Sequence, residues 1–77
     1  MKRDLKIREL LASVIDVPLD QISPQASMDD FEQWDSLAQM NLVIAIEEEF
    51  EITIPDDEVG TMVSLPLIES LLEELIS

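Results

Sequence analysis

The hydroxyl of Ser36 is the group in this sequence best placed to carry chemistry. It lies in the run Asp35-Ser36-Leu37, where a polar stretch meets a segment whose apolar residues recur at steps of three and four. Asp35 and Ser36 are both helix-capping types, and Ser36 with Gln39 fits the S/T-x-x-E/Q capping box. We therefore expect the hydroxyl at a helix N-terminus, where unpaired N–H groups and the helix dipole favour a phosphate ester. On spacing alone, a purely structural cap remains the simpler interpretation.

Four helical segments and no strands are predicted around this serine. The expected helices are residues 4–15, residues 36–50, a short helix from Asp56, and a last helix capped by Ser64. Pro66 falls in the first turn of the last helix, where proline is tolerated. Residues 52–54 alternate as a strand would, but no partner strand is predicted. We expect an extended linker there that buries an isoleucine, with Pro55 favouring the extended geometry.

The first and last helices each carry an apolar stripe that we expect to be buried. The stripes are Ile7, Leu10, Leu11, Val14 and Ile15 in the first helix and Leu67, Ile68, Leu71, Leu72, Leu75 and Ile76 in the last. The connection 16–35 is long, so its own side chains should anchor it: Ile22, Met28, Phe31 and Trp34. Three longer helices and one short helix can close an all-α bundle around one core. We expect a single domain over residues 1–77.

Charge is distributed unevenly along the chain. The 77 residues carry a net charge of −14, and the four basic residues all lie within the first eight positions: Lys2, Arg3, Lys6 and Arg8. A surface this acidic repels nucleic acid and anionic membranes and attracts proteins with basic patches. We therefore expect no nucleic-acid or membrane partner. Solubility alone explains part of this acidity.

The predicted helix 36–50 ends in three acids, Glu47-Glu48-Glu49. Negative charge at a helix C-terminus opposes the helix dipole and costs roughly a few tenths of a kcal/mol or more. Because the acids lower the stability of the helix, their presence at this end favours a functional reason for them. Docking of a basic partner is the reason we expect.

Catalytic and metal-binding patterns are missing from the sequence. It has no His and no Cys, and a single glycine, Gly60, excludes a glycine-rich phosphate loop. The acids 56–58 lack the spacing and the glycine of an EF-hand, so we expect no metal site. Neither a readable signal peptide nor eighteen consecutive apolar residues occur, which favours a soluble cytoplasmic protein. We expect a monomer that is not an enzyme.

Three stretches of the sequence together resemble the acyl carrier protein family. They are Trp-Asp-Ser-Leu from Trp34, the acid-tailed helix Asn41–Phe50, and Ile-Thr-Ile-Pro-Asp-Asp-Glu from Ile52 to Glu58. The resemblance covers essentially the whole chain. It implies that Ser36 is esterified by 4′-phosphopantetheine, which a phosphopantetheinyl transferase moves from coenzyme A with Mg²⁺. The terminal thiol of this arm would hold an acyl group as a thioester, and the acyl chain would lodge between helices.

The resemblance also implies which residues partner enzymes contact. The matching positions are Asp35, Leu37, Met40, Ile44, Glu47 and Glu48, with Asp35 and Leu37 flanking the attachment serine. Acyl-loading and acyl-using enzymes would meet the acids with basic docking patches. Met40 and Ile44 fit an ordinary core position equally well. Trp34, Ala38 and Asn41 depart from the usual pattern of fatty-acid carriers, which favours a specialised stand-alone member.

Two other functions remain open at this stage. The first is an acidic helical module that binds partners without a covalent group, in which Ser36 only caps a helix. The second is an aminoacyl or peptidyl carrier. The sequence does not separate fatty acyl, polyketide and related cargoes.

Overall fold

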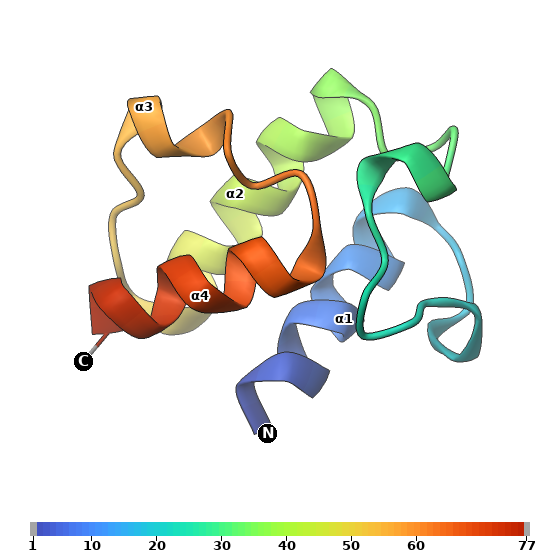
Figure 1. The fold of residues 1–77 in the computed structure, drawn as a ribbon, viewed down its shortest axis with the longest axis horizontal. Coiled ribbons are helices and arrows are strands. Elements are labelled where there is room, and N and C mark those ends of the chain that lie inside the picture. The colour runs from blue at the N-terminus through green and yellow to red at the C-terminus, as the bar shows by residue number, and fades with distance from the viewer. Residues whose placement is uncertain (1, 77) are drawn as a thin grey trace.

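The computed structural model describes residues 2–76, with side chains described from residue 5 onward. Four α-helices follow one another along the chain (Figure 1): α1 Lys2–Ile15, α2 Ser36–Phe50, α3 Asp56–Val59 and α4 Leu65–Ile76. Two short 3₁₀ turns, η1 Leu19–Gln21 and η2 Met28–Asp30, lie in the long connection between α1 and α2. Over the described range no strand forms, and one isolated bridge joins Ser27 to Ser64. The predicted all-α architecture of three longer helices and one short helix is confirmed.

Helix α1 packs against both α2 and α4, and the core lies between these three helices. In α1 the predicted stripe faces this core: Ile7, Leu11 and Ile15 are buried, and Leu10 and Val14 pack beside them. Residues at steps of four on one helix face meet the same neighbour, which is why these three are buried together.

The buried face of α4 is rotated relative to the predicted one. Leu65, Ile68 and Leu72 are fully covered, whereas Leu67 is 49% exposed and Ile76 is 39% exposed. The prediction was wrong for Leu67 and Ile76. Leu67 lies about 100° around the helix from Ile68, so packing against α1 turns it toward solvent.

The connection between α1 and α2 is held by its own side chains, as predicted. Ile22 and Trp34 are each 2% exposed, and Met28 and Phe31 pack against the same cluster. Backbone hydrogen bonds tie this connection to the start of α4: Met28 N donates to Val63 O at 2.9 Å, and Leu65 N donates to Ala26 O at 2.8 Å. Ser64 Oγ accepts from Leu67 N at 3.4 Å, in agreement with the predicted cap.

The segment between α2 and α3 is an extended linker. Glu51, directly after α2, has a left-handed backbone with φ 55°, which reverses the chain. Ile54 is 3% exposed, so the linker buries an isoleucine as expected. In the part of the chain that the structure describes, no helix is long and apolar enough to cross a membrane.

Candidate functional site

Helix α2 begins at Ser36, and the residue that caps it is Asp35. The carboxylate Oδ1 of Asp35 accepts a hydrogen bond from Ala38 N at 2.9 Å, while its carbonyl accepts the first helical bond, from Gln39 N, at 2.8 Å. The predicted capping box of Ser36 with Gln39 was wrong. Asp35 has extended backbone and stands one residue earlier, so its short side chain reaches the N–H that a cap must satisfy.

The Ser36 hydroxyl therefore does not cap the helix. Ser36 is exposed, and no described residue forms a hydrogen bond with its side chain. Within residues 2–76 the backbone N–H groups of Ser36 and Leu37 have no protein acceptor either. These amides and the positive end of the α2 dipole surround the hydroxyl, an arrangement that suits a phosphate ester.

Three apolar side chains of α2 point into solvent after Ser36. Leu37 is 69% exposed, Met40 is 62% exposed and Ile44 is 51% exposed. This answers the question that the sequence left open, because Met40 and Ile44 are surface residues and not core. Large apolar groups exposed close together along one helix form a candidate interaction surface.

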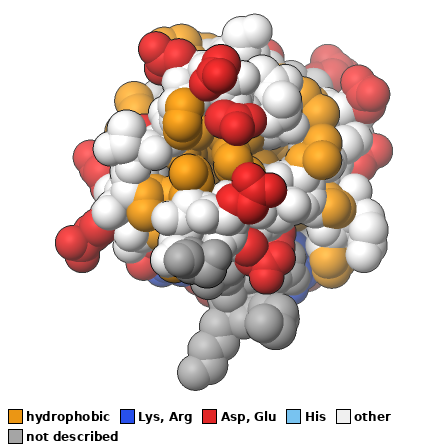
Figure 2. Space-filling view, turned by 60° about the vertical axis from the view of Figure 1, so that its left-hand side comes forward, with side chains coloured by type: hydrophobic (Ala, Val, Ile, Leu, Met, Phe, Trp, Pro, Cys, Tyr) orange, Lys and Arg blue, Asp and Glu red, His pale blue; other side chains and the backbone are white. Residues whose placement is uncertain are grey.

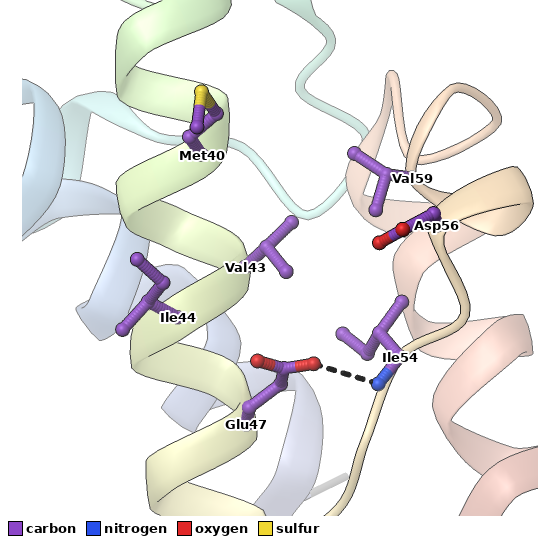
Figure 3. Close-up of a pocket in the computed structure, with 7 residues that line it drawn as sticks. All are labelled: Met40, Val43, Ile44, Glu47, Ile54, Asp56 and Val59. Carbon is purple, nitrogen blue, oxygen red and sulfur yellow. Dashed lines mark hydrogen bonds between the residues drawn. The ribbon is translucent and has the colours of Figure 1, made fainter.

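A groove of about 370 Å³ opens between α2 and the segment 54–59. We call it the α2–α3 groove; its lining residues are Met40, Val43, Ile44, Glu47, Ile54, Asp56 and Val59. In Figure 3, Val43 and Glu47 extend from α2 toward Ile54, Asp56 and Val59, whereas Ile44 lies at the outer edge. Figure 2, which brings the α3 side forward, shows hydrophobic side chains gathered among Asp and Glu side chains. The groove is thus an apolar hollow beside acids.

A family model and several known proteins match this chain. The model described as "Phosphopantetheine attachment site" matches residues 5–75. An acyl carrier protein of Streptomyces coelicolor is 32% identical over 73 residues, which cover 94% of this chain and 79% of that protein. The chain belongs to the acyl carrier protein family. The acyl carrier protein of Acidothermus cellulolyticus is 38% identical over 56 residues, covering 73% of this chain and 67% of that protein. That of Picosynechococcus is 42% identical over 52 residues, covering 68% of this chain and 64% of that protein, just under two thirds.

A solved structure shares the fold of this family member. The holo acyl carrier protein of Nitrosomonas europaea superposes with a TM-score of 0.81, and the match covers 96% of this chain and 95% of that one. Sequence identity to it is 23%, so this likeness shows the fold alone. The predicted acyl-carrier-like bundle is confirmed at that level.

The prosthetic group of this family is 4′-phosphopantetheine, and the start of α2 fits it. An exposed hydroxyl with no protein partner, beside unpaired helix amides, is the chemistry that a phosphate ester needs. Among the described residues, no group of three or more His, Cys, Asp or Glu side chains is gathered where it could hold a metal ion.

Two of the three acids at the end of α2 have structural contacts. Glu47 Oε2 accepts a hydrogen bond from Ile54 N at 2.8 Å, which fastens the linker to α2 (Figure 3). Glu49 lies 3.6 Å from Lys6 Nζ in an ion pair, both side chains being 41% exposed. Glu48 is exposed. The unfavourable placement of acids at this helix end therefore has a structural cause, whereas the docking role expected from the sequence stays a prediction.

Sequence reasoning missed the role of Gln39. It is 7% exposed and is the one polar side chain among the buried residues that the structure describes. Its position is three and four residues before Leu42 and Val43, on the buried face of α2. That periodicity was the available signal. The groove residues from 54 to 59 gave no local signal, because only folding brings them opposite α2.

Proposed function

We propose that Ser36 carries the 4′-phosphopantetheine arm and that the protein is a carrier of acyl groups. The observation that carries this proposal is the exposed Ser36 hydroxyl at the first residue of α2, released from capping by Asp35. Asp35 holds the turn in place, and Leu37 lies beside the serine on the surface. When bound, the arm supplies a thiol that holds the acyl group as a thioester.

The protein itself needs no catalytic residue for this task. A phosphopantetheinyl transferase would attach the arm to Ser36 Oγ from coenzyme A, and acyl-handling enzymes would perform the later chemistry. The α2–α3 groove supports the assignment, because an apolar hollow lined by Val43, Ile54 and Val59 can keep an acyl chain from water. Its volume of about 370 Å³ is near the lower end of ligand pockets, which favours a short or medium acyl chain.

Partner enzymes would bind the surface around Ser36 and along α2. The residues that we propose for this contact are Asp35, Leu37, Met40, Ile44, Glu47 and Glu48. Exposed apolar groups beside acids suit enzymes that present a basic patch around an apolar centre. We further infer a monomeric single carrier domain that works in the cytoplasm, where a transferase and acyl-handling enzymes of fatty acid, polyketide or related synthesis would reach it.

The test is the intact mass of the protein after incubation with coenzyme A, Mg²⁺ and a broad-specificity phosphopantetheinyl transferase. We expect the wild type to gain one phosphopantetheine and Ser36→Ala to gain none. Ser70→Ala is the matched control, because Ser70 is also an exposed helical serine and should leave the addition intact. Helical circular dichroism checks that each variant is folded.

Addition to Ser36→Ala would overturn the assignment of the site. No addition to folded wild type, with several transferases, would overturn the carrier function. It would favour the other candidate, an acidic helical module that binds partners without a covalent group. The net charge of −14 is the observation behind that alternative.

A further inference from the structure

A buried side-chain amide connects three separate segments of the fold. Gln39 Oε1 accepts a hydrogen bond from Trp34 Nε1 at 2.8 Å. Its Nε2 donates to Met62 O at 2.8 Å and to Val59 O at 3.3 Å. Gln39, in α2, is thereby linked to Trp34, the residue before the α2 cap, and to the end of α3 and the connection after it.

The orientation of this amide follows from its partners. An indole N–H can only donate and a backbone carbonyl can only accept. The oxygen of Gln39 must therefore face Trp34, and its nitrogen must face the carbonyls of Val59 and Met62. Reversing the amide would place two acceptors against each other and leave the indole donor unpaired in the core. Trp34, Gln39 and Met62 are each 7% exposed or less. Leaving a hydrogen-bonding group unpaired among them would therefore be costly.

This network lies on both sides of Ser36 and also reaches the groove. Trp34 is two residues before Ser36 and Gln39 is three residues after it. Val59, whose carbonyl accepts from Gln39, also lines the α2–α3 groove. Val59 therefore belongs both to the groove and to the hydrogen-bond network that reaches Trp34, two residues before Ser36.

We propose that Gln39 is a positioning residue that couples the placement of α3 to the turn that presents Ser36. That the turn at Ser36 matters for function rests on the proposed function. The coupling between α3 and this turn does not depend on it. Filling or opening the groove would then change the Ser36 turn through one buried amide. The two hydrogen-bonded ends make the coupling reciprocal, so that an enzyme gripping the turn would also act on α3.

The experiment uses the unmodified protein labelled with ¹⁵N, so it does not depend on attachment of the arm. Asp57→Gly loosens α3 from an exposed position that neither lines the groove nor contacts Gln39. We expect this change to shift the single indole N–H signal of Trp34 and the Ser36 and Leu37 amides. The shift should exceed the spread among α1 amides, which serve as the internal reference.

In a Gln39→Met background the same Asp57→Gly change should move the α3 signals but no longer those of Trp34 and Ser36. Ile15→Val is the matched control, since it weakens the core in α1 without touching the network. In that background the response at Ser36 should persist. A response at Ser36 that survives Gln39→Met, or is absent from the starting protein, would overturn the proposal.

Trp34→Phe is the second variant, in case Gln39→Met does not fold. It removes the indole donor and keeps both hydrogen bonds of Gln39 Nε2, to Val59 O at the end of α3 and to Met62 O in the connection that follows. We expect the side-chain amide signals of Gln39 to respond to Asp57→Gly still, while the response of the Asp35 and Ser36 amides falls. An unchanged response at Ser36 would show that the Trp34 arm of the network transmits nothing.

Discussion

Asp35 and Ser36 stand side by side at the start of α2 and have different tasks. A helix start needs an acceptor for its unpaired N–H groups, and Asp35 supplies it to Ala38 at 2.9 Å. Ser36 is exposed, and its hydroxyl forms no hydrogen bond with any described residue. This division suits the proposed modification of Ser36, because esterifying a hydroxyl that served as a cap would break a structural hydrogen bond.

Replacing Asp35 by Ala should therefore cost stability. Loss of an N-cap acceptor typically costs about 1 kcal/mol, which in a domain of this size lowers Tm by roughly 4–8 °C. Asp35→Asn keeps a side-chain oxygen and should retain most of the stability. Thermal melting followed by circular dichroism distinguishes the two variants. Equal losses in both would show that the charge of Asp35, and not its hydrogen bond, stabilises α2.

At the scale of the elements, the helices and the buried face of α1 could be predicted closely, but the buried face of α4 could be predicted only in part. Local signals indicate the start of α2, through the capping types Asp35 and Ser36, and the first turn of α4, through Pro66, and these are short-range effects. Which face of α4 is covered depends on α1, which is far away in sequence, so Leu67 was misassigned. For the same reason Ser36 could be identified as the candidate site, whereas the groove and Gln39 needed the folded chain.

Glu47 fastens the linker between α2 and α3 through a hydrogen bond. Substituting it should distinguish the effect of this hydrogen bond on stability from the effect of the negative charge. Glu47→Ala leaves the Ile54 N–H without its acceptor, an effect of about 1–3 kcal/mol. Relief of the unfavourable helix dipole offsets roughly 0.3–1 kcal/mol of this. We expect a net loss of about 1 kcal/mol in urea unfolding at neutral pH, together with faster hydrogen exchange of the Ile54 amide.

Two neighbouring substitutions serve as controls for Glu47→Ala. Glu47→Gln keeps an acceptor and should match or exceed the wild-type stability. Glu48→Ala removes a neighbouring exposed acid and should change the free energy of unfolding by less than about 0.5 kcal/mol. If Glu48→Ala destabilised as much as Glu47→Ala, the hydrogen bond to Ile54 would not be the cause.

At the scale of the whole molecule, a net charge of −14 lowers the stability of the folded state, because the acids repel one another and the core is small. We expect added NaCl to raise Tm, because screening relieves repulsion among the acids in the folded state. Relief of about 1 kcal/mol would correspond to roughly 4–8 °C. The Lys6–Glu49 pair is weakened by the same salt, but an exposed pair contributes at most about 1 kcal/mol.

Melting curves from low ionic strength to about 0.5 M NaCl measure this effect. Lys6→Gln makes the chain more acidic and removes the ion pair, so its Tm should start lower and rise more steeply with salt. A Tm that stays constant or falls in the wild type would mean that repulsion does not limit the stability of this fold.

The buried indole of Trp34 is also an intrinsic fluorescent probe. The chain has a single tryptophan and no tyrosine, so near-ultraviolet fluorescence comes almost entirely from one ring. That ring is 2% exposed and hydrogen-bonded to Gln39, two residues from Ser36. Its emission maximum and lifetime therefore report on the immediate surroundings of Ser36, the proposed attachment site. Under the proposed function, we expect loading, unloading and enzyme binding to change this emission, so that each can be followed in real time without attaching a dye.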